Sequence, residues 1–519
     1  MKRKTYTTFA AIHLGSEALG MDIVEYRGLK GLKVIERCHR HIRLGEETFK
    51  NKIIPFSMVN EICEILIGFK ELMQADGVEE YALQATTAIR EARNQTFLLD
   101  QIKTKTGLDV EVVDMPWEIY TKYVAIRQTM REQQINVDRD GVLMVDISSG
   151  GLGITYVQDD QIRYQENLRL GIIRIKESFS RIQRNSSKFN RALVQFLSSN
   201  LGPVRQAMEA KPARYLVLSG PETEIVLQLL GRQTGLKVQR VTAQEFRDLA
   251  QKVDQLNLSQ IIKVYDLPEE AAELVLPTLI FYEQMLDLVP AQEVVFLPDR
   301  FIDGMTLLHI GMNKDRDFRK LLENEKLSIL HHFGTLYKYD SKHALQVERL
   351  ATIIFDKLGK RHGLDGHCRI LLKGAALLHD IGKFVSMRHH SLYSYQLIMA
   401  TDLLGFSERD KKIIAYASYY HARNIFGEGD RGEVPAPEME LKAIVAKIAA
   451  ILCLADALDR SYLQKIQTCQ VSTKGEEVII GVTSKQDLAL EEWTFADKAS
   501  MFEEIFGLKV HMERVSEHG

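Results

Sequence analysis

The stretch Ala10–Gly45, AAIHLGSEALGMDIVEYRGLKGLKVIERCHRHIRLG, decides the fold of the first half of the chain. Its apolar runs are separated first by a small-residue turn and then by a glycine turn, which predicts three consecutive strands. The stretch Val142–Gly171, VLMVDISSGGLGITYVQDDQIRYQENLRLG, repeats this order, and both stretches close on Arg-Leu-Gly. We interpret the repeat as an internal duplication, which predicts two related α/β lobes, residues 1–128 and 129–305, that face each other.

The second half of the chain has a different pattern. Residues up to about 300 alternate β-like and helical runs, whereas residues 318–466 are almost wholly helical, and this change marks a domain boundary. We therefore expect an all-helical domain over residues 306–470. A strand-like run, a helical run and a second strand-like run then predict a small α+β domain over residues 471–519.

Composition limits the class of protein. The chain has 519 residues, 45% hydrophobic and 26% charged, which is typical of a soluble globular protein with several domains. No stretch approaches the roughly 20 uncharged apolar residues that a membrane span needs, and the five cysteines form no CxxC pair. A net charge of −3 gives no global attraction to nucleic acid. We expect a cytoplasmic protein that neither inserts into a membrane nor binds a specific nucleic acid.

Small-residue turns follow the first strand of each predicted lobe. Without a Cβ, backbone N–H groups can approach an anion closely and form a concave nest that suits phosphate. One such turn alone is more often a simple hairpin, but two in a duplicated frame favour a cleft that grips a phosphate chain from both sides. The candidate phosphate-binding residues in these turns, and in a third turn at Ser219–Thr223, are Gly15, Ser16, Ser148, Ser149, Gly150, Gly151 and Gly220.

Several motifs, taken in order, resemble the exopolyphosphatase and guanosine pentaphosphate phosphatase family (Ppx/GppA). They are AIHLGSEALG, ATTAIREARN, MVDISSGGLGITYV, RLGIIRIKESF, HALQVERLATIIFDKL and HDIGKFVSMRHHSLYSYQLI. The resemblance implies two actin-like ATPase (ribonuclease H-like) lobes, a helical HD-type domain, a small C-terminal domain and a homodimer. It also implies hydrolysis of a terminal phosphoanhydride in the interlobe cleft.

The resemblance places the catalytic glutamate on Glu118, the phosphate-side arginine on Arg90 and a metal-recruiting acid on Asp146. Such hydrolysis needs an oriented water, a general base and a cation that neutralises the transferring group. Each residue also has a plainer reading. Glu118 could be an exposed carboxylate at a helix start, Asp146 could initiate a turn, and Arg90 could pair with Glu91 or Glu118 on a helix surface.

The same loops depart from the family pattern at the expected metal ligands. The first-loop Asp is His13 here and its Asn is Glu17, while the final Glu of the second loop is Gly153. Asp146 remains, with Glu17 as a candidate replacement. We therefore expect the cleft to hold a divalent cation, Mg²⁺ or Mn²⁺, only weakly.

The stretch Ala375–His390, AALLHDIGKFVSMRHH, places adjacent His379 and Asp380 at the end of an apolar helix. Similarity to HD-type phosphohydrolases implies a metal site made by His343, His379, Asp380 and Asp456. His343 lies one turn before Val347, so its side chain can follow the apolar stripe of its helix. Imidazole and carboxylate ligands suit a metal that activates water on a phosphoester. His389, His390 and His421 could bind a second metal or a phosphate, or could be surface residues.

Together these patterns predict a phosphoanhydride hydrolase that releases terminal phosphate from inorganic polyphosphate or guanosine pentaphosphate. Two alternatives remain. The HD-type centre could act on a phosphomonoester or cyclic nucleotide, or the altered cleft could only bind an alarmone or polyphosphate and regulate the helical domain. His13 and Gly153 favour the alternatives, whereas Glu118 and Arg90 favour the hydrolase.

Overall fold

The structure is a computed structural model that describes residues 6–135, 140–147, 151–184, 186, 188–232, 238–297, 301–422 and 434–515. The chain divides into two compact units, Met1–Leu322 and Glu323–Gly519. Within the described ranges, no helix combines the length and the apolar character that crossing a membrane requires.

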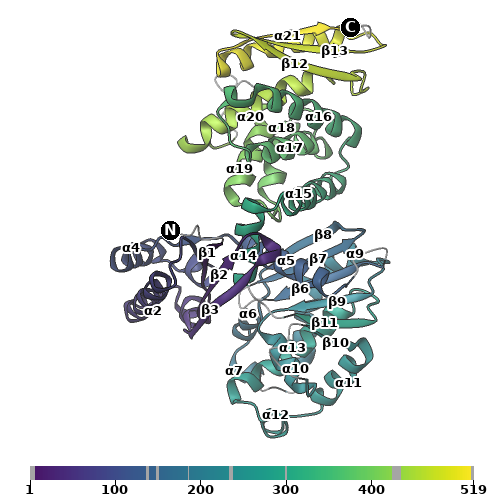
Figure 1. The fold of residues 1–519 in the computed structure, drawn as a ribbon. Coiled ribbons are helices and arrows are strands. Elements are labelled where there is room, and N and C mark those ends of the chain that lie inside the picture. The colour runs from purple at the N-terminus through teal and green to yellow at the C-terminus, as the bar shows by residue number, and fades with distance from the viewer. Residues whose placement is uncertain are drawn as a thin grey trace. The chain divides into compact units, whose positions relative to one another are not determined.

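The first unit begins with a five-stranded sheet (Figure 1). Its strands are β1 (Thr7–Leu14), β2 (Ala18–Tyr26), β3 (Lys33–His41), β4 (Glu80–Ala85) and β5 (Glu111–Val112), in the order β3-β2-β1-β4-β5. The first three strands pair antiparallel, as the turn pattern predicts, whereas β4 runs parallel to β1 and β5 parallel to β4.

A six-stranded sheet follows in the same unit. Its strands are β6 (Val142–Ile147), β7 (Leu152–Gln158), β8 (Gln161–Leu168), β9 (Tyr215–Ser219), β10 (Gln239–Thr242) and β11 (Glu293–Leu297), in the order β10-β11-β9-β6-β7-β8. Strands β6, β7 and β8 pair antiparallel, β9 runs parallel to β6, and β11 runs parallel to β9. This repeats the arrangement of the first sheet and adds β10 as an antiparallel edge strand.

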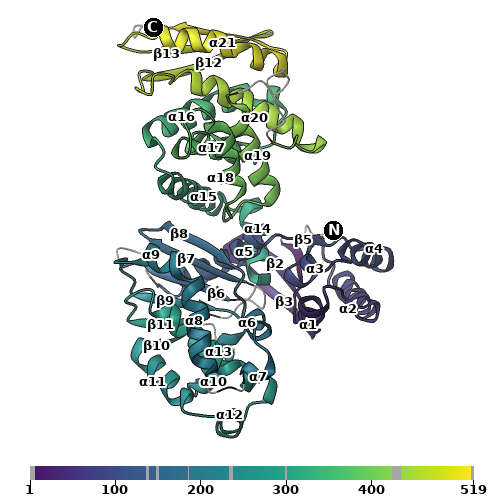
Figure 2. The same cartoon turned by 180° about the vertical axis from the view of Figure 1, so that it is seen from behind.

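Helices cover both sheets. The remaining helices of this unit are α1 (Leu44–Asn51), α2 (Phe56–Ala75), α3 (Thr87–Glu91), α4 (Gln95–Thr106), α5 (Met115–Glu132), α6 (Ile172–Glu177), α7 (Arg181–Arg184), α8 (Phe189–Asn200), α9 (Gly202–Met208), α10 (Glu222–Leu229), α11 (Ala243–Asp254), α12 (Leu258–Tyr265), α13 (Glu269–Leu286) and α14 (Phe301–Lys314). Helices α2 and α4 share a core with one face of the first sheet, where Ile12, Ile62 and Ile102 are fully buried. Helices α8 and α13 cross one face of the second sheet (Figure 2).

Helices α5 and α14 link the two sheets. Helix α5 follows the first sheet along the chain, yet Ile119 of α5 lies against Gly153 of β7 in the second sheet. Helix α14 follows the second sheet, yet Phe301 and Met305 share a core cluster with Phe9 of β1. The two helices touch where Gly304 approaches Thr121 so closely that a Cβ there would lie 2.0 Å from the Thr121 carbonyl oxygen. Each helix therefore packs against the sheet that it does not follow along the chain, and α5 lies against the second sheet.

The second unit combines helices with a small sheet. Helix α15 (Arg316–Leu336) begins in the first unit and continues into the second. The other helices of the second unit are α16 (Ser341–Leu358), α17 (Cys368–Leu378), α18 (His390–Met399), α19 (Glu408–Tyr420), α20 (Met439–Ala457) and α21 (Ala489–Phe506), and its strands β12 (Thr468–Lys474), β13 (Glu477–Thr483) and β14 (Lys509–Arg514) pair in that order. One core cluster joins Leu372 of α17, Ile451 of α20, Val478 of β13 and Phe502 of α21. The predicted limits of the four domains, and the HD-type character of the helical segment, stay predictions.

Candidate active site and candidate metal centre

The first candidate site lies at the start of α5 and at the end of β6. We call it the interlobe site and define it by Thr87, Arg90, Glu118, Lys122 and Asp146. Asp114 caps α5 by accepting a hydrogen bond from the Trp117 backbone N–H (2.8 Å). Glu118 therefore falls in the first helical turn, where the helix dipole favours a carboxylate.

Arg90 and Glu118 are in contact. Arg90 Nη1 donates hydrogen bonds to Glu118 Oε2 (3.1 Å) and to the Val113 carbonyl oxygen (2.7 Å), and Arg90 Nη2 donates to Thr87 Oγ1 (2.9 Å). Thr87 Oγ1 lies 3.2 Å from the same Glu118 oxygen. Glu118 is only 6% exposed, so it is not an exposed carboxylate at a helix start. The two residues that the resemblance places in catalysis thus form a charge-assisted pair between a half-buried arginine and a buried glutamate.

Glu91 forms ion pairs with other residues, so it is not the main partner of Arg90. Its Oε1 accepts from Arg174 Nη2 (2.6 Å), and its Oε2 lies 3.5 Å from Lys52 Nζ. Arg174, which belongs to α6 of the second lobe, also lies over the ring of Phe49. This ion pair connects α6 to α3 and α1 beside the interlobe site.

A second buried ion pair lies one helical turn beyond Glu118. Lys122 Nζ is 3.3 Å from Asp146 Oδ2, and both residues are buried. The pair was not predicted from the sequence. The spacing of Glu118 and Lys122, four residues apart on one helix, places them on one face and was the available signal. The approach of that face to Asp146 depends on how α5 crosses the second sheet.

The positions that depart from the family pattern have local explanations. His13 Nε2 lies 3.1 Å from Thr86 Oγ1, and its ring packs against Phe301 of α14. Gly153 pairs with Asp146 across β6 and β7, and a Cβ on Gly153 would lie 2.7 Å from Ile119 Cγ2. Glu17 is exposed at the turn between β1 and β2.

The predicted phosphate turns are described in part. The backbone N–H of Gly15 donates to the Ala18 carbonyl oxygen (2.9 Å), which closes a hairpin turn that contains the buried Ser16. Gly220 has a φ of 136°, and a Cβ there would lie 2.4 Å from the Ile147 carbonyl oxygen, so only glycine allows β9 to end this close to β6. Gly151 is buried at the start of β7. Ser148, Ser149 and Gly150 lie outside the described residues.

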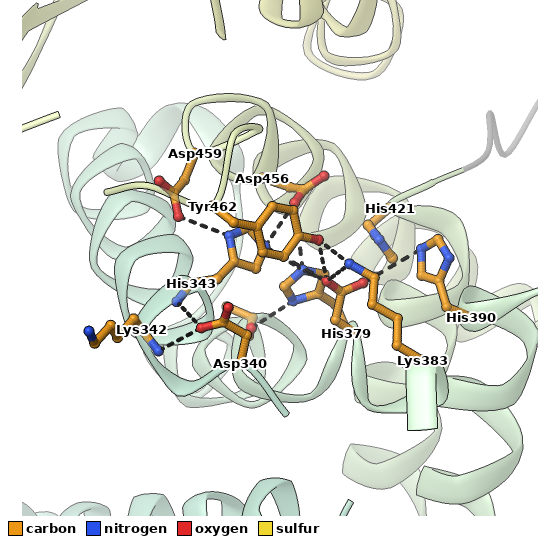
Figure 3. Close-up of polar contacts among 12 residues, drawn as sticks. Asp340, Lys342, His343, His379, Lys383, His390, His421, Asp456, Asp459 and Tyr462 are labelled. Atoms are coloured by element: carbon orange, nitrogen blue, oxygen red, sulfur yellow. Dashed lines mark hydrogen bonds and ion pairs between the residues drawn. The ribbon is translucent and has the colours of Figure 1, made fainter. Parts of the chain in front are cut away.

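The second candidate site lies at one end of α16, α17 and α20 in the second unit. His343 Nε2 is 3.3 Å from His379 Nε2, 3.2 Å from Asp456 Oδ1 and 3.8 Å from Asp380 Oδ2. His379 Nε2 lies 3.5 Å from Asp380 Oδ2 and 3.6 Å from Asp456 Oδ1. Figure 3 shows His343, His379 and Asp456 pointing toward one another. The four residues implied by the resemblance therefore converge within one cluster, which we call the histidine–aspartate centre.

Further contacts orient these side chains. His343 Nδ1 is 2.9 Å from Asp459 Oδ2, and His379 Nδ1 is 2.8 Å from the Ala376 carbonyl oxygen, so the Nε2 atom of each ring faces the centre. Tyr462 stacks on the His343 ring and donates a hydrogen bond to Asp380 Oδ2. Orienting partners of this kind are typical of metal-ligating histidines. Sequence reasoning missed both Asp459 and Tyr462.

Other polar side chains surround Asp380. Lys383 Nζ contacts Asp380 Oδ2, and His390 Nε2 lies 3.6 Å from Asp380 Oδ1 (Figure 3). His421 is buried, its Nδ1 is held by the Ser418 carbonyl oxygen (2.6 Å), and its ring packs edge-on against His379. His421 is therefore not a surface residue. His389, which precedes α18, is partly exposed.

The protonation states of these side chains depend on their burial and on their charged neighbours. Burial lowers the pKa of His421 to about 3, with the nearby His379 acting in the same direction, so its imidazole is neutral. Burial also lowers the pKa of His343, but hydrogen bonds to Asp456 and Asp459 outweigh this effect and raise it to about 9. Hydrogen bonds from His343 and His379 hold the pKa of Asp456 well below its usual range despite burial. Two imidazoles and two carboxylates fit a divalent metal, and a bound cation would compete with the proton on His343.

Comparison with known proteins gives a consistent result for both units. The model of the Ppx/GppA phosphatase family matches residues 23–300, and the model of Ppx/GppA phosphatase domain III matches residues 327–497. A guanosine-5'-triphosphate,3'-diphosphate pyrophosphatase of Aeromonas hydrophila is 21% identical over 465 residues, which cover 86% of this chain and 87% of that protein.

Two solved structures have a similar fold. The Ppx/GppA family member of Aquifex aeolicus is 19% identical and superimposes with a TM-score of 0.51 over 60% of this chain and 99% of its own. An exopolyphosphatase of Cytophaga hutchinsonii is 15% identical, with a TM-score of 0.51 over 59% of this chain and 98% of its own. At these identities the two structures support the fold alone.

Proposed function

The chain belongs to the Ppx/GppA phosphatase family, and from this premise we propose that its interlobe site hydrolyses the terminal phosphoanhydride bond of inorganic polyphosphate or guanosine pentaphosphate. The observation that carries the proposal is the contact between half-buried Arg90 and buried Glu118 at 3.1 Å, with Thr87 bonded to both. The names of the similar proteins from Aeromonas and Cytophaga support these two substrates.

Each residue of the site has a distinct role in this reaction. Glu118 accepts a proton from water as the water oxygen attacks the terminal phosphorus. The bond between that phosphorus and the bridging oxygen breaks, so orthophosphate and a chain shortened by one phosphate leave. Arg90 is 22% exposed at its side chain, whereas Glu118 is 7% exposed. In this proposal the more exposed Arg90 binds the phosphate oxygens of the substrate, which frees Glu118 for the water.

In this proposal the turns at Ser16, Gly151 and Gly220 bind the remaining phosphates, while the Gly15 N–H closes its hairpin turn. Asp146 holds the ammonium group of Lys122 in position beside these turns. Homodimer formation and a cytoplasmic location remain predictions from the resemblance and the composition.

The test separates chemistry from binding. We expect Glu118→Gln to lower kcat for orthophosphate release by roughly 10²- to 10⁴-fold while the Kd for tripolyphosphate changes little. Glu132→Gln is the matched control, because Glu132 is an exposed glutamate at the other end of α5. An unchanged kcat in Glu118→Gln would exclude Glu118 as the base.

The histidine–aspartate centre supports a second candidate function, metal-dependent hydrolysis of a phosphate ester. The observation that favours it is that ligand atoms of His343, His379 and Asp456 lie within 4.8 Å of one another and are buried. A divalent metal bound there would activate a water molecule. Lys383 and His390, which both contact Asp380, would orient the phosphate. Loss of phosphomonoester or cyclic-nucleotide hydrolysis in His379→Gln, with Glu118→Gln unaffected, would assign that activity to this centre.

A further inference from the structure

Lys122 and Asp146 form a buried ion pair in the interlobe site. Lys122 comes from α5 and Asp146 from the end of β6, and their side chains are 6% and 8% exposed. A buried pair of this kind adds little net stability, because the loss of hydration offsets the attraction between the charges. Its position one helical turn from Glu118 therefore points to a role in binding.

The residues around this pair do not fit a divalent cation. A hard cation such as Mg²⁺ needs several oxygen ligands. Asp146 forms an ion pair with Lys122. His13 has no carboxylate to offer a cation, and its ring contacts Thr86. Gly153, opposite Asp146 across the two strands, has its side-chain space filled by Ile119. Among the positions where the family's loops carry metal ligands, Asp146 thus offers the one buried carboxylate in the described residues, and it already has a cation.

Helix α5 accounts both for the filled space beside Gly153 and for the cation beside Asp146 at the second sheet. Ile119 and Lys122 are three residues apart on α5, so they lie on the same face and reach the neighbouring positions Gly153 and Asp146. Helix α5 thereby places an apolar group where one acidic ligand is absent and an ammonium group beside the acid that remains.

We propose that Lys122 is a built-in cation of the interlobe site and that it replaces the divalent metal in binding the phosphate chain. This inference rests on the proposed function and identifies which cation neutralises the substrate. The ammonium group of Lys122 binds an oxygen of the phosphoanhydride chain while Asp146 holds its position. The substrate class is an uncomplexed linear polyphosphate or nucleotide polyphosphate, which this site binds without Mg²⁺.

The experiment is isothermal titration of the full chain with tripolyphosphate, in EDTA and separately in excess Mg²⁺. We expect the wild type to bind in EDTA with a Kd within about threefold of that in Mg²⁺, and Lys122→Met to weaken binding in EDTA by roughly tenfold or more, as for loss of one charged hydrogen bond. Lys105→Met, at an exposed lysine of α4, is the matched control and should bind as the wild type does.

Lys122→Met leaves Asp146 buried without its cation, so a second variant guards against misfolding. Lys122→Met/Asp146→Asn removes both charges, and we expect it to fold and to show the same loss of binding in EDTA. Binding by the wild type only when Mg²⁺ is present, or undiminished binding by the double variant, would overturn the role of Lys122 and leave the proposed function in place. No binding of tripolyphosphate in either buffer would instead overturn the proposed function itself, and this inference with it.

Discussion

Ile119 of α5 fills the space that a side chain at Gly153 of β7 would need. The distance from a Cβ on Gly153 to Ile119 Cγ2 would be 2.7 Å, closer than real Cβ contacts allow. The contact packs α5, which follows the first sheet along the chain, on β7 of the second sheet. The glycine is thus part of the packing of α5 on the second sheet.

We predict that Gly153→Ala destabilises the first unit by about 1–3 kcal/mol through overpacking. Ile119→Ala combined with Gly153→Ala should recover part of that loss, because the isoleucine methyl groups are the atoms in conflict. Thermal unfolding of both variants and of Ile119→Ala measures the coupling. Simple additivity of the two single changes would contradict the contact.

The same contact changes how a metal site could be restored. From the sequence, His13→Asp with Gly153→Glu is expected to rebuild the family's acidic loops and to raise activity. The structure indicates that Ile119→Ala must be added, because a glutamate side chain introduced at Gly153 has no room beside Ile119. We expect Mn²⁺ to stimulate orthophosphate release in the triple variant more than in the wild type. Equal stimulation of the double variant without the Ile119 change would show that Ile119 is no obstacle.

The buried Lys122–Asp146 pair gives a prediction about stability. Lys122→Met leaves an uncompensated carboxylate and should cost about 3–5 kcal/mol of unfolding free energy. Lys122→Met/Asp146→Asn removes both charges and should cost clearly less. Chemical denaturation of the two variants provides the comparison. Equal losses in both would contradict the claim that the unpaired Asp146 carboxylate causes the destabilisation.

The histidine–aspartate centre predicts bound metal in the purified protein. Asp380→Asn should lower the metal content and the melting temperature of the second unit, because a bound cation links α16, α17 and α20. Asp356→Asn is the control, since Asp356 forms an exposed ion pair with Arg369. Elemental analysis and melting curves with and without chelator are the measurements. Equal metal content in both variants, or no metal after incubation with Mn²⁺, Mg²⁺, Fe²⁺ or Zn²⁺, would contradict the assignment.

Lys326 of α15 predicts a pH dependence of the second unit. Burial lowers its pKa to about 8, against the opposing effects of Asp410 and Glu323, and its ammonium lies over the ring of Phe406. Because the unfolded chain binds the proton up to a pKa near 10.5, the unfolding free energy rises with pH between about 8 and 10.5. The rise due to this group is of the order of 3 kcal/mol.

Lys326→Met should remove that component, so it should stabilise the unit more at pH 7 than at pH 10. The difference between variant and wild type in urea unfolding at the two pH values isolates this lysine from the others that titrate. A difference that does not change with pH would show that Lys326 titrates normally.

Sequence patterns predicted the strands better than the packing between lobes. The first three strands of each sheet follow from local alternation and small-residue turns, which short-range sterics decide. The crossing of α5 onto the second sheet depends on contacts such as Thr121 with Gly304, which are far apart along the chain. For this reason the Lys122–Asp146 pair was missed, although the spacing of Glu118 and Lys122 was visible.

At the histidine–aspartate centre, the resemblance named His343, His379, Asp380 and Asp456 because the spacing of their motifs along the chain is itself diagnostic. Asp459 and Tyr462 were missed because their contacts with His343 depend on the irregular chain that follows α20. His421 was left open between ligand and surface residue, because only the tertiary packing of α19 buries it.

The central claim is that the interlobe site, and not the histidine–aspartate centre, releases phosphate from polyphosphate. The most direct measurement is initial-rate orthophosphate release from polyphosphate and guanosine pentaphosphate, with and without Mg²⁺ or Mn²⁺, for wild type, Glu118→Gln and Asp380→Asn. We predict that Glu118→Gln loses roughly 10²-fold or more of the rate on the preferred substrate while Asp380→Asn retains it. Retained activity in Glu118→Gln together with loss in Asp380→Asn would contradict the claim and assign the reaction to the second unit.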